Sequence, residues 1–125
     1  MSADTAKMDG QFSLTPAMFH ILLSLADRER HGYGIMQEIA ALTDGAMRLG
    51  AGTLYRSIRA LLDGGLIEES DERPDPALDD ERRRYYRLTD HGQQLAAAEA
   101  RRLATLVRIA QTRRLLTAPE AAPSE

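Results

Sequence analysis

No cysteine and no tryptophan occur among the 125 residues of the sequence. Without cysteine the chain cannot form a disulfide, use a thiolate nucleophile or hold a metal through sulfur. Imidazole ligands come only from His20, His31 and His91, whose spacing lacks the paired pattern of a zinc site such as H-E-x-x-H. We therefore expect no metal site and no cofactor, and we place the histidines in turns and on the surface.

Long apolar runs are also missing, because His20 and Ser24 interrupt even the run at residues 19–25. A membrane-spanning helix needs about 20 consecutive apolar residues, and the opening MSADTAKMDGQ has neither the basic nor the apolar region of a secretory signal. We expect a cytoplasmic protein with no membrane association. Since 43% of the residues are hydrophobic, the chain can bury the core of a single domain.

Enzyme signatures are absent as well, since the sequence has no GxSxG, P-loop or GxGxxG motif. Acidic pairs such as Glu68-Glu69 and Asp79-Asp80 could suggest acid–base or calcium chemistry. They fall, however, in a polar stretch broken by Pro74 and Pro76, with no apolar wall that would shift a pKa. An enzyme is therefore the weakest hypothesis.

Negative charge is lacking from residues 45–62, which hold three arginines, Arg48, Arg56 and Arg59. Residues 63–81 have the opposite character, with nine acids against a single arginine, and they account for the net charge of −3. The field at a binding face depends on the local patch and not on the total charge. The acidic balance therefore does not exclude a nucleic-acid partner.

Apolar spacing and start signals predict three helices in the first half of the chain. Thr15 before Pro16 marks the first start, because threonine caps a free N–H group and proline suits the first helical position. The expected helices run from 16 to about 27, from about 33 to 42 and from about 51 to 62. We expect residues 30–32 to be a break, and Gly64-Gly65 to close the third helix.

The third predicted helix has two different faces at 100° per residue. One face is apolar and should pack on the core. It consists of Leu54, Ile58, Leu61 and Leu62. The other face is free to bind a partner, and it consists of Gly52, Tyr55, Arg56, Arg59 and Asp63.

Two short strands are predicted next, at residues 66–68 and 84–88, and they can pair as a hairpin with a long acidic tip. Side chains alternate along a strand, so one of the two tyrosines should face the core, and we assign Tyr86 to the core and Tyr85 to the solvent. Arginines gather where the second strand begins. They are Arg82, Arg83, Arg84 and Arg87.

A long last helix is predicted from residue 93 to about 116, and its apolar stripe comprises Leu95, Leu103, Leu106, Val107 and Ala110. At about 1.5 Å per residue this helix exceeds 30 Å, which is longer than the small domain before it can cover. Part of the stripe therefore needs a second chain, and the sequence predicts a homodimer held by these residues.

Three helices followed by an arginine-rich hairpin give the element order of a winged helix-turn-helix, a mainly α fold with a little β structure (α+β). A helix fits the major groove of DNA, so Arg56 and Arg59 can reach guanine edges or phosphates, while Arg82, Arg83 and Arg84 reach the flanking backbone. The predicted partner is double-stranded DNA. We expect a flexible tail at 1–13, the winged domain at 14–89, the dimerisation helix at 90–116 and a second tail at 117–125.

From residue 14 to about 116 the sequence resembles the PadR-type bacterial transcriptional regulators. The resemblance is carried by LTPAMFHILLSLADRERHGYGIMQEI, by LGAGTLYRSIRALLDGGLIEE and by RRRYYRLTDHGQQL. The second and third stretches are the specific ones, since Gly-Thr-Leu-Tyr at 52–55 and Tyr-Tyr-Arg-Leu-Thr at 85–89 are unlikely to recur together by chance. The single C-terminal helix is similar to that of the smaller branch of the family.

This resemblance implies a homodimeric repressor on a pseudo-palindromic operator, released by a small hydrophobic or phenolic effector. It also implies that Tyr33, Thr53 and Tyr55 lie at the DNA surface, with residues 82–85 in the wing. The chain departs from the family pattern at three positions: Gly50 and Ala51 stand in place of Ser-Pro, and Arg56 stands in place of Pro. The operator sequence is therefore expected to differ.

A winged-helix adaptor that binds protein and not DNA is the alternative, because the same fold serves both purposes. Such an interface would more often be apolar or aromatic at its centre. The outward pair of Arg56 and Arg59 favours DNA.

Overall fold

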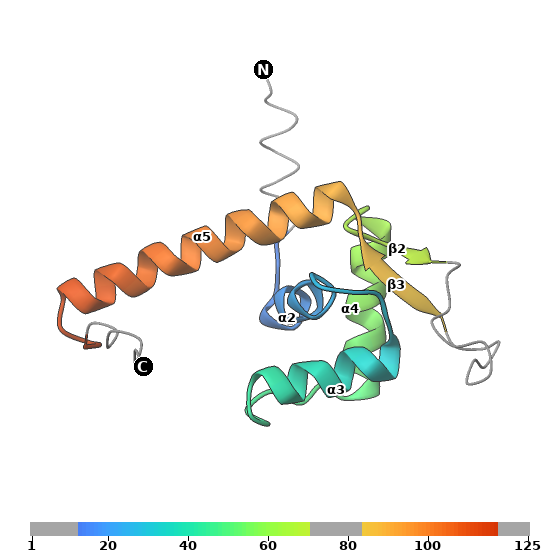
Figure 1. Cartoon of the computed structure of the whole chain (residues 1–125), viewed down its shortest axis with the longest axis horizontal. Coiled ribbons are helices and arrows are strands. Elements are labelled where there is room, and N and C mark those ends of the chain that lie inside the picture. Colours follow the sequence, from blue (N-terminus) through green and yellow to red (C-terminus); the bar gives the residue numbers. More distant parts are fainter. Residues whose placement is uncertain (1–12, 71–83, 118–125) are drawn as a thin grey trace, which may run out of the picture.

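The computed structural model describes residues 13–70 and 84–117 (Figure 1). The predicted tails lie almost entirely outside this part of the chain, as does the hairpin tip at 71–83. The elements are, in order, α2 (Pro16–Ser24), β1 (Arg30–His31), α3 (Gly32–Leu42), α4 (Ala51–Asp63), β2 (Ile67–Ser70), β3 (Tyr85–Leu88) and α5 (Asp90–Thr112).

Side-chain caps explain where three of the helices begin. The Thr15 hydroxyl accepts a hydrogen bond from the Met18 N–H (3.1 Å) before Pro16, as the sequence predicted. The Thr89 hydroxyl caps α5 in the same way, by accepting from the Gly92 N–H (3.0 Å). His31 caps α3, because its Nδ1 accepts from the Gly34 N–H (3.1 Å). The half-buried His31 therefore has a structural function that its expected place in a turn did not reveal.

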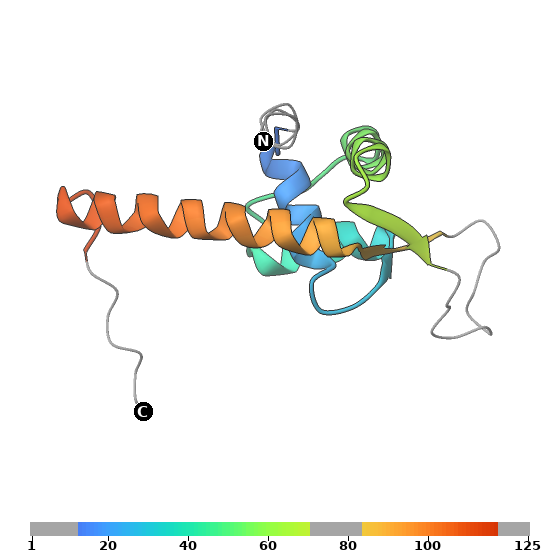
Figure 2. The ribbon, with the colours of Figure 1, turned by 90° about the horizontal axis from the view of Figure 1, so that it is seen from above.

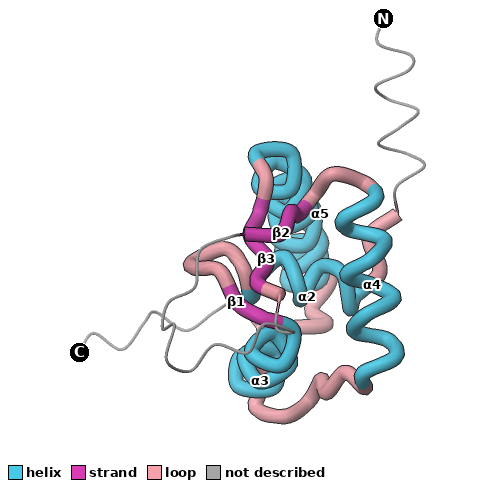
Figure 3. The backbone as a smooth tube through the Cα atoms, turned by 90° about the vertical axis from the view of Figure 1, so that its right-hand side faces the viewer, coloured by secondary structure: helices cyan, strands magenta, loops and turns pink. Residues whose placement is uncertain are grey.

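The core lies between the helices and one face of the sheet, with α2 in contact with α3, α4 and α5 (Figure 3). Its buried residues come from every element except β1 and α5, as well as from Leu25 and Leu66 just outside them. They are Ile21, Leu22, Leu25, Ile35, Ile39, Leu54, Ile58, Leu61, Leu66, Ile67 and Tyr86. The predicted apolar face of α4 is thus confirmed, and Tyr86 faces inward as expected.

The antiparallel sheet has the strand order β1-β3-β2. Strand β3 is therefore central, since it pairs with β2 in the hairpin on one edge and with β1 on the other. The expectation that residues 30–32 form only a break was wrong, since Arg30 pairs with Tyr86 and His31 with Tyr85. A strand of two residues has no alternation to read in a sequence. It forms here because β3 offers it an open edge.

Helix α5 begins against the domain and then runs away from it (Figures 1 and 2). Its first turn lies so close to the start of β2 that a Cβ on Gly92 would meet the carbonyl carbon of Leu66 at 2.9 Å. Two hydrogen bonds hold this junction, from the Thr89 hydroxyl to the Gly65 carbonyl (2.6 Å) and from the Thr89 N–H to the Leu66 carbonyl (3.1 Å). The small residue at position 92 permits this approach.

The predicted end of the last helix near residue 116 was too late, because α5 ends at Thr112. Arg114 takes the left-handed conformation (φ 65°). The Leu115 N–H then donates to the Ala110 carbonyl (2.8 Å), and the Arg114 N–H donates to that of Gln111 (3.0 Å). This pair of bonds is the Schellman ending of a helix. The sequence did not reveal this helix end, because Arg114 stands where glycine is usual.

No helix within residues 13–70 and 84–117 is both long and apolar enough to cross a membrane.

Candidate nucleic-acid interface

The outward face of α4 is the centre of the candidate interface. Leu54, Ile58 and Leu61 anchor the helix in the core, which leaves Tyr55, Arg56 and Arg59 facing solvent. All four α4 residues that were predicted to meet DNA are exposed. They are Thr53, Tyr55, Arg56 and Arg59. The Arg56 guanidinium lies 3.4 Å from the Thr53 hydroxyl, and Arg59 has no ion pair among the described residues.

Tyr55 connects this face to the start of α3. A Cβ on Gly32 would lie 2.9 Å from Cζ of Tyr55, so the phenol ring rests directly on the first residue of α3. Tyr33, the next residue, is 56% exposed, and Tyr55 is 51% exposed. Tyr33, which the family motifs place at the DNA surface, thus directly follows the residue of α3 that Tyr55 contacts. A side chain at position 32 would have to displace the end of the Tyr55 ring.

The hairpin supplies one further cation to the described surface. Arg84 stands just before β3 and forms an ion pair with Glu69 of β2 (Nη1 to Oε1, 3.1 Å). On the opposite face of the hairpin, Arg87 pairs with Glu68 (2.8 Å). Arg82 and Arg83, also predicted to contact DNA, lie outside the described residues.

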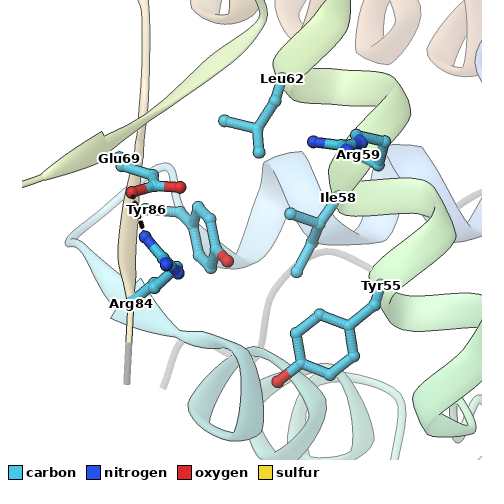
Figure 4. A pocket seen from close by; sticks show the side chains of 7 residues that line it. All are labelled: Tyr55, Ile58, Arg59, Leu62, Glu69, Arg84 and Tyr86. Atoms are coloured by element: carbon cyan, nitrogen blue, oxygen red, sulfur yellow. Dashed lines mark hydrogen bonds and ion pairs between the residues drawn. The ribbon is translucent and has the colours of Figure 1, made fainter. Parts of the chain in front are cut away.

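A groove of about 400 Å³ separates α4 from the hairpin (Figure 4). Its lining is apolar at Ile58 and Leu62 and polar elsewhere. The polar members are Tyr55, Arg59, Glu69, Arg84 and Tyr86. The groove therefore joins the predicted reading helix to the predicted wing, and both of its arginines belong to the predicted set.

Two polar groups of this groove, Glu69 and the Tyr86 hydroxyl, were missed in the sequence. Tyr86 was predicted only as a core residue, and it is 5% exposed. Burial raises its pKa, the charge of Glu69 and the nearby Tyr55 raise it further, and Arg84 lowers it by less. The register that pairs Glu69 with Tyr86 could have indicated this contact, but a long hairpin tip leaves the register open in a sequence.

A second hollow, of about 360 Å³, lies where α4 meets the start of α2. Thr53, Arg56 and Ser57 line it from α4, and residues 15–18 line it from the N-cap and the first turn of α2. The candidate surface thus continues from α4 to the beginning of α2.

The predicted dimer residues of α5 fall into two environments. Leu95 packs against the core of its own domain, so it anchors the helix. Leu103 and Ala110 are half-buried, whereas Leu106 and Val107 are 48% and 45% exposed. Ile109, which was not in the predicted set, is 46% exposed.

A polar, cationic helix beside a short antiparallel sheet, with a long helix leaving the domain, defines a winged helix-turn-helix protein. A comparison with protein families matches residues 21–98 to one of them. The chain belongs to the transcriptional regulator PadR-like family. It is therefore a DNA-binding transcriptional regulator and not an enzyme, and the family and fold predicted from the motifs are confirmed.

Solved structures agree with this assignment of the fold. A transcriptional regulator from Clostridium thermocellum has a TM-score of 0.63 at 23% identity, covering 90% of this chain and 96% of that one. A PadR family regulator from Clostridium difficile R20291 has a TM-score of 0.64 at 18% identity, covering 78% and 97%. RosR of H. salinarum, in a complex structure named hsRosR-SG, has a TM-score of 0.61 at 25% identity, covering 78% of each chain. The search of curated proteins found no match.

Proposed function

We propose that this regulator is a cytoplasmic homodimeric repressor, which binds a pseudo-palindromic operator and is released by a small hydrophobic or phenolic effector. The main support for DNA binding is the outward face of α4, which exposes Thr53, Tyr55, Arg56 and Arg59. Residues 45–62 include no acid, so α4 has no negative charge before Asp63 that would repel the phosphates of DNA.

In this proposal α4 enters the major groove. Arg56 and Arg59 contact guanine edges or phosphates, since guanidinium groups suit both partners. Tyr33 and Tyr55 lie beside the groove and contact the backbone through their hydroxyls. Arg84, together with Arg82 and Arg83, holds the hairpin on the flanking backbone.

Dimerisation through α5 is supported by the exposure of Leu106 and Val107 on a helix of 23 residues. Leu103 and Ala110 fall on the same side of this helix. Such a stripe gains stability when a second copy covers it. The effector part is supported by the family resemblance.

Binding of labelled DNA from upstream of the protein's own gene tests the proposal. Wild-type binding should fall steeply between low and physiological salt, and Arg56→Ala/Arg59→Ala should weaken it at least about tenfold. Arg101→Ala/Arg108→Ala removes the same charge from the side of α5 opposite the apolar stripe and should have a much smaller effect. Equal losses in the two double mutants, or no binding by the wild type at low salt, would contradict the assignment of α4. Addition of phenolic compounds to the complex then tests the effector.

A further inference from the structure

The groove between α4 and the hairpin holds a buried polar group that has no partner among the described residues. Tyr86 lies almost wholly inside the protein, since only 5% of it is exposed. Its hydroxyl makes no hydrogen bond with any residue in the described ranges. Figure 4 shows the ring crossing from β3 toward α4, with the hydroxyl turned to the space among Tyr55, Ile58 and Arg84. The hydroxyl thus faces an open groove in which no described side chain binds it, so an acceptor that enters the groove only has to replace water there.

The two arginines that line this groove differ in their ion pairing. Arg59 lines the groove from α4 and has no ion pair with a described residue. Arg84 lines it from the hairpin and is held by Glu69 at 3.1 Å. Both members of that pair are well exposed, at 65% and 46%, and an ion pair so open to water is weak. A stronger anion can therefore take the place of Glu69.

We propose that this groove binds one phosphate of the duplex DNA backbone, with Tyr86 and Arg59 as hydrogen-bond donors. In the free protein Glu69 forms an ion pair with Arg84, and the incoming phosphate displaces Glu69 from it. The inference rests on the proposed DNA-binding function and assigns two further residues to it. Tyr86 becomes a DNA-binding residue, and Glu69 becomes a competitor for the backbone.

The chemistry of each group fits a phosphodiester. Its two free oxygens accept hydrogen bonds and can meet a hydroxyl and a guanidinium at once, and charge-assisted bonds of this kind are strong. Burial and the nearby Glu69 raise the pKa of Tyr86, so its hydroxyl keeps the proton that it would donate.

The removal of one oxygen tests the first half of the proposal. Tyr86→Phe keeps the ring that fills the core, and it deletes only a hydroxyl that has no partner in the described part of the protein. We expect unchanged or higher thermal stability together with a loss of about tenfold in affinity for DNA. A 30-base-pair duplex of arbitrary sequence serves as the probe, because phosphate contacts carry no sequence information. Loss of stability in parallel with affinity, or unchanged affinity, would overturn the assignment of Tyr86.

A matched pair of glutamates tests the second half. Glu69→Gln and Glu68→Gln remove the same charge from neighbouring positions of β2, but only Glu69 shares the groove with Arg84, while Glu68 pairs with Arg87 on the other face. Glu69→Gln should raise affinity for the duplex roughly threefold more than Glu68→Gln. Arg84→Ala should then cost more affinity when it is combined with Glu69→Gln than when it is made alone. Equal gains in the two glutamine variants would mean that only net charge matters, which would overturn the competition.

The two levels of the hypothesis fail differently. If wild type binds the duplex and Tyr86→Phe and Glu69→Gln behave like their controls, the proposed function stands and the phosphate site is wrong. If wild type binds no duplex even at low salt, both are wrong.

Discussion

Tyr85 and Tyr86 are neighbours on β3 and show how one step along a strand changes the environment of a side chain. Tyr86 lies in the core with its hydroxyl in the groove, whereas Tyr85 is half-buried and meets the His31 ring edge-on, with ring centroids 5.3 Å apart. The alternation of the strand predicted that one of the two points inward, and the choice of Tyr86 for that position is confirmed. It could not predict the raised pKa, because the burial and the charge of Glu69 arise from other elements.

The raised pKa of Tyr86 leads to a stability prediction at high pH. Above pH of about 10 the unfolded chain releases the phenolic proton, while the folded chain still holds it. Protons are then bound more tightly by the folded state, so the free energy of unfolding falls as pH rises, by up to about 1.4 kcal/mol per pH unit, until the folded pKa is passed. Urea denaturation between pH of about 8 and 11 should show a shallower fall for Tyr86→Phe than for wild type.

Tyr85→Phe is the control for this measurement, since it removes a hydroxyl from the other face of the same strand. If both tyrosine variants lose stability with rising pH as wild type does, the burial of Tyr86 is not the cause of the fall in the free energy of unfolding at high pH.

Among the elements, α5 has the tightest backbone contact, which lies at its first turn. Gly92 lies against the main chain at Leu66, and Thr89 joins α5 to the end of α4 through the Gly65 carbonyl. The direction of α5 relative to the DNA-binding domain is therefore determined at this junction. A shift there would move the far end of α5, since a helix of 23 residues amplifies a small rotation at its base.

Gly92→Ala is predicted to lower the free energy of unfolding by about 1–3 kcal/mol, because the new methyl group would collide with backbone and not with a flexible side chain. Gly52→Ala makes the same change in the first turn of α4, where only an Arg56 nitrogen lies near, at 3.4 Å. That variant should be neutral or slightly stabilising through its better helix propensity. Chemical denaturation compares the two, and a similar effect from both would refute the close-approach argument.

For the whole molecule, the proposed homodimer depends on the half of α5 that leaves the domain. Leu106 and Val107 are exposed there, and Leu95 is not part of this free stripe because it packs on its own core. Two domains joined through α5 should present their α4 helices about 34 Å apart, which is one turn of duplex. This spacing is what a two-fold operator requires.

Leu106→Glu should convert the dimer to a monomer, because a charge in the centre of an apolar contact is left without water or partner. Thr105→Glu adds the same charge one residue away, on the side of the helix opposite the apolar stripe, and should leave the dimer intact. Sedimentation equilibrium distinguishes the two masses, and DNA binding should weaken together with dimerisation. A wild-type protein that sediments as a monomer at micromolar concentration would contradict the dimer.

Much of this molecule could be predicted from local patterns, because helix caps and apolar spacing act within a few residues. Thr15 with Pro16, the two faces of α4 and the tyrosines of β3 are examples, and the motif at 52–55 led to the family. Strand β1 could not be predicted, since its two residues form a strand only through pairing with β3. The groove likewise exists only in the tertiary structure, because Tyr86, Glu69 and Arg59 come from three elements whose contact depends on the register of the hairpin and the packing of α4.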